Sequence, residues 1–552
     1  MTDRFSQLAT PPRRLRLDLW TPGAVIIAAV VLSPILSIVW IAFNPVENIW
    51  PHLLATVLPR YLLTTVLLML GVALLTALIG TGAAWLVSQY RFPGRDWLAW
   101  ALLFPLAIPA YVGAYALVDF LDYAGPLQTA MRATFDWASA RDYWFPETRS
   151  LWAAVLVLSL ALYPYVYLLA RAAYREQSGC TYEVARALGC GPWGMFWRVG
   201  LPLARPAIAA GVALALMETV ADYGTVQHFG VQTLTTGIFS TWLNGGNAGG
   251  AAQIAGVILM LILLLVGLER AGRGSARFYR LGRGSRPIER QAILGWRRWL
   301  ATAACLLPFA AGFVLPVGVM LANSMAAPEG WLAPGLIDAL WNTLVVAGLA
   351  SLATVGAALF LVYALRQSGS RVVRWVLPLT LVGYAAPGAV LALGLLIPLA
   401  AVDHRLADTV LALTGWDPGL LITGTAFALG LAYLVRFFGI AQGALDAAFG
   451  RVSPSLPMAA RSLGRTAGGT LGAVYLPLMR GSVFMALLVV FVDCVKELPA
   501  TLLLRPFNYN TLSTRVYELA SLERLSEAAP AALVVMAVGL VAVGLLAHGQ
   551  RD

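Results

Sequence analysis

The chain is nearly devoid of lysine, because Lys496 is the single lysine among 552 residues and the other basic side chains are arginines. A phosphate-binding loop of the form G-x-x-x-x-G-K-[ST] needs a lysine that reaches the phosphates. Lys496 follows the letters VDCV, so this motif is absent. We therefore expect that the chain holds no cofactor of its own and has no ATP-hydrolysing site.

Cysteine and histidine are also scarce, with four residues of each. No CxxC, HxxxH or HExxH spacing occurs, so the sequence predicts neither a disulfide framework nor a firm metal site. The cysteines are expected to be small apolar fillers, and the isolated histidines to be solvated. The residues concerned are Cys180, Cys190, Cys305 and Cys494, and His52, His228, His404 and His548.

Charged residues make up only 12% of the chain, whereas 59% of it is hydrophobic and the mean hydropathy is +0.76. A soluble protein of this length could not bury so much apolar surface, so membrane lipid is the expected solvent. The net charge of +11 could indicate nucleic-acid binding. However, the arginines cluster in short connectors between apolar runs, which the positive-inside rule explains, and we expect no nucleic-acid partner.

Apolar runs of about 20 residues, long enough to cross a bilayer as helices, recur along the chain. We predict an all-α membrane protein in which a first half (1–268) and a second half (299–552) are joined by a basic, Gly-rich cytoplasmic linker (269–298). The first apolar run is too long for a signal-peptide core and is expected to be retained. The predicted spans are 23–43, 62–88, 98–118, 151–173, 203–222, 251–268, 299–322, 341–365, 374–400, 419–440, 482–503 and 530–548.

Basic connectors alternate with loops richer in Asp and Glu, and all basic connectors fall on one side if both termini are cytoplasmic. The halves are also repeats of each other. At an offset of 275, residues 183–206 (EVARALGCGPWGMFWRVGLPLARP) and residues 458–481 share ten of 24 positions without a gap. Composition alone would give roughly two or three. A weaker match aligns Pro109 with Pro387. Six spans per half is an even number, so the repeats should be parallel, related by an axis along the membrane normal.

Each copy of the repeated loop predicts a short helix, a turn and a rigid re-entry into the membrane. Gly189 and Gly464 are suited to the left-handed conformation that ends a helix. Pro202 and Pro477 are suited to the first turn of the following span. Such a loop can pass motion between a cytoplasmic partner and the spans. The alternative is an interfacial amphipathic helix that only stabilises its own bundle.

The loop resembles the EAA signature, E-A-A-x-x-x-G and, after a gap, I-x-L-P, of permease subunits in binding-protein-dependent ABC importers. The first copy (within loop 176–202) has Glu183, Ala185, Gly189 and Pro202, and the second (within 445–477) has Met458, Ala460, Gly464 and Pro477. The resemblance covers both halves and implies a type I ABC importer permease fold in the bacterial inner membrane. It also implies that each loop docks on one of two copies of a cytoplasmic ATPase subunit, and that a periplasmic binding protein delivers the substrate. Because Met458 replaces the acidic residue, the two contacts are expected to differ in strength.

Acidic residues follow each loop at the end of the next span. In the 275 register Glu218 aligns with Asp493 and Asp222 aligns with Glu497, so each half has two carboxylates one helical turn apart. Ionisable groups at membrane depth are costly and suggest a transport pathway, here one suited to a cation. The alternative is local pairing, in which Lys496 neutralises Asp493 or Glu497.

The segments that contain or follow these carboxylates are similar to the fused two-half permeases of ferric-iron importers. They are residues 221–238 (ADYGTVQHFGVQTLTTGI) and 496–520 (KELPATLLLRPFNYNTLSTRVYELA). Iron(III) prefers oxygen ligands, which the four carboxylates and the phenol of Tyr223 could offer in a transient contact. Thiamine permeases share the fused layout, and polyamine importers share the loops, so these substrates remain alternatives.

Two rival hypotheses are an ATP-independent secondary transporter, which can also have twelve spans, and a membrane scaffold without transport activity.

Overall fold

The computed structural model describes residues 20–177, 179–273, 290–368, 371–381, 383 and 386–549, and confirms an all-α membrane protein. The basic N-terminus (1–19) and most of the predicted linker lie outside the described residues. One parallel pair of two-residue strands, β1 (Tyr90–Arg91) and β2 (Gln291–Ala292), joins the end of the linker to the first half. Helix α13 continues to Arg273, five residues past the predicted end of that half.

Eleven helical segments of the described chain are long and apolar enough to cross a membrane, or twelve if a bent pair counts as one span. In the first half these are α1 (Trp20–Phe43), α3 (Leu58–Gln89), α7 (Leu151–Glu176), α10 (Leu201–Ala221) and α13 (Ala248–Arg273). In the second half they are α14 (Arg297–Phe309) continued through η4 (Ala310–Val314) into α15 (Leu315–Ala326), then α16 (Leu336–Ser368), α19 (Gly388–Thr414), α20 (Ala426–Arg451), α23 (Leu476–Val495) and α26 (Leu525–Gly549).

The shorter elements connect these spans. They are α2 (Trp50–Ala55), α4 (Arg95–Ala101), η1 (Phe104–Ala107), α5 (Ala110–Leu121), α6 (Pro126–Phe135), α8 (Gly179–Ala187), α9 (Pro192–Met195), η2 (Phe196–Gly200), α11 (Gly224–His228), α12 (Leu234–Phe239), η3 (Ser240–Asn244), η5 (Pro328–Leu332), α17 (Arg371–Thr380), α21 (Ser455–Ser462), α22 (Ala467–Thr470), η6 (Leu471–Tyr475), α24 (Pro499–Leu504) and α25 (Leu512–Ser521).

Two predicted spans are broken at the aligned prolines. The predicted straight span 98–118 is instead bent by 96° between the segments Arg95–Ala107 and Ala110–Phe135, with Pro109 at the bend. Pro387 likewise caps α19, so the predicted span 374–400 is divided between α17 and α19. A proline forces the preceding residue out of the helical region, and Ile108 is accordingly extended (φ −99°, ψ 122°). The predicted span 482–503 also stops early, because α23 ends at Val495.

The repeat extends to individual hydrogen bonds. The Thr65 hydroxyl accepts from the Leu234 amide (3.0 Å), and the Thr343 hydroxyl accepts from the Leu512 amide (2.8 Å). Thr343 is 278 residues after Thr65, and Leu512 is 278 residues after Leu234, so the two hydrogen bonds are equivalent. Thr65 and Thr343 match at 278 before the loops, and the 275 register of the loops returns to 278 between Glu497 and Leu512, where the second half has the longer connection. The halves therefore share local folding as well as sequence.

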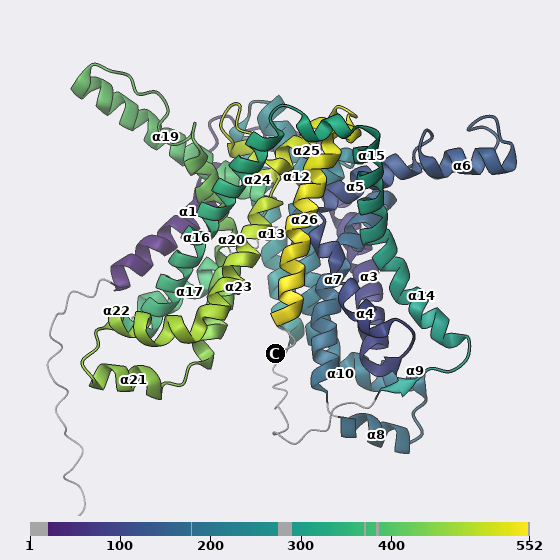
Figure 1. The fold of residues 1–552 in the computed structure, drawn as a ribbon. Helices are drawn as coiled ribbons and strands as arrows, with labels where there is room; N and C mark the ends of the chain where they lie inside the picture. The colour runs from purple at the N-terminus through teal and green to yellow at the C-terminus, as the bar shows by residue number, and fades with distance from the viewer. Residues whose placement is uncertain are drawn as a thin grey trace, which may run out of the picture.

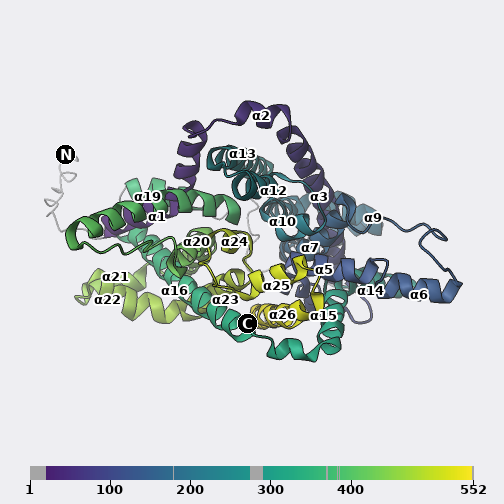
Figure 2. The same ribbon diagram turned by 90° about the horizontal axis from the view of Figure 1, so that it is seen from above.

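The first helix of each half packs on the other half. Helix α1 contacts α16, α17 and α19, whereas α15 contacts α5 of the first half as well as α26. Figure 2 shows α1 beside α19, and α15 beside α5 and α26. A long helix of each half thus packs on the other half, and apolar side chains fill the interface between the halves.

The two ends of the molecule differ in what they carry (Figure 1). Helices α8, α9, α21 and α22 lie at the end where the described chain finishes, which we call the loop end. Helices α6, α12 and α25 lie at the opposite end, which we call the outer end. The repeated loops are therefore displayed together on one face.

Candidate functional site

A central cavity of about 110 Å³ lies where α5, α7 and α10 of the first half meet α20 and α23 of the second. The tertiary structure brings all six residues of the predicted pathway to its wall. These are Glu218, Asp222, Tyr223, Asp493, Lys496 and Glu497, joined by Tyr111, Tyr165 and Arg436, which the sequence analysis did not single out. The two acidic segments, far apart in sequence, therefore face one space.

Two of the four carboxylates hold the backbone at the point where the long helices end. Asp222 lies two residues before α11 and accepts hydrogen bonds from the Thr225 and Val226 amides of that helix (2.9 and 3.2 Å). At the repeat-equivalent position, Glu497 lies two residues before α24 and accepts from the Ala500 amide (3.1 Å). A carboxylate at a helix N-terminus satisfies amides that have no partner within the helix and is favoured by the helix dipole. These residues thus have a structural role in both halves.

Ion pairs show which carboxylate Lys496 contacts, while the pathway role of these residues stays a prediction. The Lys496 Nζ atom lies 2.7 Å from Asp493 Oδ1, one turn earlier on the chain. Glu497 pairs instead with Arg436, whose Nε atom lies 2.9 Å from its Oε2 atom. This second pair is deeply buried, with the side chains 10% and 4% exposed. A Cβ atom on Gly388 would overlap both charged groups, so the pair needs glycine at that place.

Arg436 is a functional candidate that the sequence analysis missed, although a signal was present. It is a charged residue inside the predicted span 419–440, and a charge at such a depth suggests function. The repeat makes the asymmetry plain, since Ala161 occupies the equivalent place in the first half and Ala221 is equivalent to Lys496. The second half therefore supplies both cations of the cavity.

Glu218 differs from the other three carboxylates. Among the described residues, it has neither an ion pair nor a hydrogen bond, although it lines the cavity in the last turn of α10. The cavity wall as a whole has four carboxylates and two basic groups. An unpaired carboxylate at this depth is costly to ionise unless a cation approaches it. Glu218 is thus the group best placed to contact a mobile cation.

The metal-ligating side chains of the described residues are dispersed. Within the described part of the chain, no group of three or more His, Cys, Asp or Glu side chains is arranged to hold a metal ion. His228 is not solvated as predicted, because its ring packs edge-on against Tyr115 with centroids 4.6 Å apart. Cys305 and Cys494 are buried, and the four cysteines are free thiols.

The repeated loops at the loop end have the predicted helix–turn form. Gly189 and Gly464 adopt left-handed conformations (φ 82° and 83°). In each copy the residue after the glycine donates to the carbonyl five residues earlier, from Cys190 to Ala185 and from Arg465 to Ala460 (3.0 and 3.1 Å). These are the bonds of a Schellman C-cap.

The loops expose apolar side chains among charged ones. Leu188 and its equivalent Leu463 are 80% and 85% exposed. Glu183 and Met458 are exposed as well, whereas Ala185 is buried. Exposed apolar clusters of this kind mark contact surfaces.

The re-entry into the membrane is less abrupt than the sequence predicts. Pro202 and Pro477 each lie in the first turn of a long helix, as expected. However, a π-helical turn precedes each proline and makes the chain helical from α9 to α10 and from α22 to α23. Wider π-turns supply a place for a proline without a helix break.

The two loops are attached to the core in different ways. In the first, the buried ring of Tyr182 packs against Trp85, with centroids 6.0 Å apart. In the second, the Tyr363 hydroxyl donates to the Ala467 carbonyl (2.6 Å), and Arg461 donates to Gln367. The Tyr475 ring of the second loop also packs on Tyr363, with centroids 5.6 Å apart, so aromatic contacts attach both loops and the second has polar contacts to α16 in addition.

Comparisons with known proteins agree with this geometry. Residues 76–270 match the family described as binding-protein-dependent transport system inner membrane component. Over 490 residues, 87% of this chain and 88% of the relative, the chain is 28% identical to the Fe(3+)-transport system permease protein FbpB 2 of Haemophilus influenzae.

Shorter relatives match part of the chain. The chain is 28% identical over 227 residues to the molybdenum transport system permease protein ModB of Escherichia coli, which covers 38% of this chain and 96% of the relative. It is 26% identical over 200 residues to the sulfate transport system permease protein CysT of Escherichia coli, 35% of this chain and 69% of the relative. With its helical spans, its doubled loop and the family match over residues 76–270, the chain is an ABC importer permease and a multi-pass inner membrane protein.

Proposed function

We propose that this permease imports iron(III), delivered by a periplasmic binding protein, by alternating access between its two halves. Two copies of a cytoplasmic ATPase subunit supply the energy, and this chain hydrolyses no ATP itself. The proposal rests on one observation above all. Carboxylates from both halves line a single cavity at the junction of the halves, and one of them, Glu218, has no partner among the described residues.

The chemistry of the cavity favours a small, hard cation. Carboxylate and phenol oxygens are the ligands that such an ion prefers, and the wall offers both. A volume of about 110 Å³ has room for an ion with several water molecules. Weak, transient contact suits a permease because the cargo must leave as readily as it enters. The same cavity is small for thiamine or a polyamine, which remain the alternatives within this class.

An oxyanion is the second candidate cargo. Lys496 and Arg436 line the same cavity, and relatives named for molybdenum and sulfate match part of the chain. Both basic groups are already engaged by carboxylates at 2.7 and 2.9 Å, which leaves the unpaired carboxylate to face the cargo. The charge balance therefore favours the cation.

The exposed loops are the proposed contacts for the ATPase subunits. Glu183, Gly189, Met458 and Gly464 lie on helix–turn units at one end of the molecule. That end would face the cytoplasm together with both termini, and residues 269–298 would link the halves there. The different attachment of the two loops supports unequal contacts with the two subunits.

Reconstitution tests the proposal directly. The permease, its ATPase and its binding protein are placed in lipid vesicles, and uptake of radioactive iron(III) and of radioactive molybdate is measured with and without ATP. We expect uptake of iron(III) that needs both ATP and the binding protein, and a fall of at least about tenfold in Glu218→Gln. Uptake without ATP would support a secondary transporter, no uptake of either ion would support a scaffold, and molybdate uptake would support an anion permease.

A further inference from the structure

A second cavity, of about 280 Å³, lies in the first half between the start of α3, α11, α12 and η3. Helix α12 lies at the outer end of the molecule, opposite the repeated loops (Figure 1). Neutral polar side chains dominate the wall of this outer cavity, and no charged residue is part of it. The lining residues that matter here are Tyr61, Tyr223, Gln227, Gln232, Thr236, Phe239, Ser240 and Asn244.

Tyr223 belongs to the walls of both cavities. Its ring stacks on Phe239 with centroids 3.7 Å apart. Its hydroxyl accepts a hydrogen bond from the Tyr517 hydroxyl of the second half (3.3 Å). One phenol ring thus stands between the outer cavity and the carboxylates of the central cavity, and its hydrogen bond to the other half depends on how the halves are positioned.

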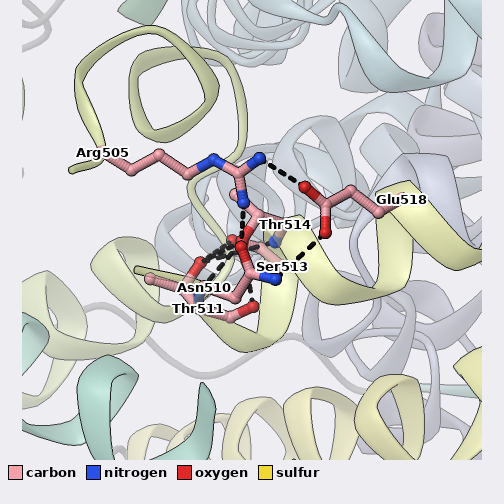
Figure 3. A network of polar contacts seen from close by, with 6 residues as sticks. All are labelled: Arg505, Asn510, Thr511, Ser513, Thr514 and Glu518. Atoms are coloured by element: carbon pink, nitrogen blue, oxygen red, sulfur yellow. Dashed lines mark hydrogen bonds and ion pairs between the residues drawn. The ribbon is translucent and has the colours of Figure 1, made fainter. Parts of the chain in front are cut away.

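The matching place in the second half is occupied by charged side chains. The 278 register aligns Gln232 with Asn510 and Ser240 with Glu518. Arg505 donates to both Asn510 and Glu518, and Asn510 donates to the second carboxylate oxygen of Glu518 (3.0 Å). Figure 3 shows this network with the hydroxyl groups that cap α25 beside it.

Among the described residues of the first half, no charged network occupies the equivalent place. Arg505 aligns with Gly230 in one register and with Gln227 in the other, and both of these residues line the outer cavity. The pseudo-symmetry of the fold is therefore broken at this place, with a charge-braced segment in one half and a neutral polar hollow in the other.

We propose that the outer cavity is an entry site for a cation on the way to the central cavity, and that Tyr223 is the gate between the two. The nature of the cation rests on the proposed function. Amide and hydroxyl oxygens can replace part of the hydration shell of a hard cation without holding it tightly. At the matching place the guanidinium group of Arg505 already occupies oxygen atoms of Asn510 and Glu518, which leaves them unavailable to a cation, so entry is confined to the first half.

A pair of variants with opposite charge tests the entry site. In the reconstituted transporter, Gln232→Arg should lower uptake of iron(III) at least about tenfold by repulsion at short range, whereas Gln232→Glu should keep or raise it. Gln232 is exposed, so both variants should fold. Thr241→Arg is the matched control, because Thr241 follows Ser240 directly and is not part of the wall. Equal loss in both charge variants, or no loss in Gln232→Arg, would overturn the proposal.

Thiol labelling tests the gate without reference to the cargo. A membrane-impermeant thiol reagent is added to the outer side of nucleotide-free transporter whose native cysteines have been replaced. Ser240→Cys should react, whereas Ala221→Cys, in the wall of the central cavity, should react only in a Tyr223→Ala background. Resistance of Ser240→Cys, or equal labelling of Ala221→Cys with and without Tyr223, would refute the gate.

The two assays separate this inference from the proposed function. If the wild-type protein takes up no iron(III), the proposed function fails, while labelling still decides whether the outer cavity leads past Tyr223 to the central one. If wild-type uptake is normal and the Gln232 variants respond alike, the entry site fails and the proposed function stands.

Discussion

Removal of Arg436 alone should destabilise the permease more than removal of Arg436 together with its partner Glu497. The Arg436 and Glu497 side chains are 10% and 4% exposed, so Arg436→Leu leaves a buried carboxylate without its ion pair. Loss of one member of a buried pair costs about 3–5 kcal/mol, whereas replacing both by apolar groups is often nearly neutral. We therefore expect the single variant to lose about 3–5 kcal/mol and Arg436→Leu with Glu497→Leu to recover most of it.

Glu497 also caps α24, which limits the recovery. Its hydrogen bond to the Ala500 amide (3.1 Å) is lost in the double variant at a cost of about 0.5–2 kcal/mol. The measurement is the free energy of unfolding by a titration with denaturing detergent, completed as a double-variant cycle. Lys496→Met is the control, because its pair with Asp493 is more exposed (28% and 19%) and should cost less. A single variant as stable as the wild type, or a double variant no better than the single one, would refute the reasoning.

Three further changes test the coupling loop, the buried pair and the repeat. Gly189→Ala should strain a backbone with φ 82° by about 1 kcal/mol and raise the ATP hydrolysed per ion imported, whereas Gly191→Ala, with φ −69° and open space around it, should not. Gly388→Ala should push apart the buried ion pair that its Cβ would overlap and so lower stability, measured by the same titration. Thr65→Val should cost about 1–3 kcal/mol, because the Leu234 amide loses its acceptor; unchanged hydrogen exchange of that amide would contradict this.

The predicted fold class and the doubled loop are confirmed because both depend on signals that are local in sequence. Long apolar runs must form helices in lipid, whatever they pack against. A glycine that ends a helix adopts its left-handed conformation through its own backbone freedom, as Gly189 and Gly464 do. The breaks at Pro109 and Pro387 also depend on local sequence. The two prolines align between the halves, but the continuous apolar runs around them led to the prediction of unbroken spans.

The candidate site was predictable as a set of residues but not as a set of interactions. The repeat register placed Glu218, Asp222, Asp493 and Glu497 at equivalent helix ends, and the structure brings them to one cavity. Their roles as pathway residues remain predictions. What the register could not show is that three of them already have partners, because Arg436 reaches Glu497 from a different helix.

The sequence by itself determined that the chain spans a membrane as helices, that its two halves repeat, and that each half displays a capped loop and a pair of carboxylates. Hydropathy, helix capping and repetition depend on neighbours along the chain. Only the tertiary structure decided that Lys496 pairs with Asp493, that α1 and α15 pack on the opposite half, and that the place matching the outer cavity holds a network of Arg505, Asn510 and Glu518. These outcomes depend on packing between segments far apart in sequence, where small differences between repeats, such as Ser240 against Glu518, select between a hollow and a charged network.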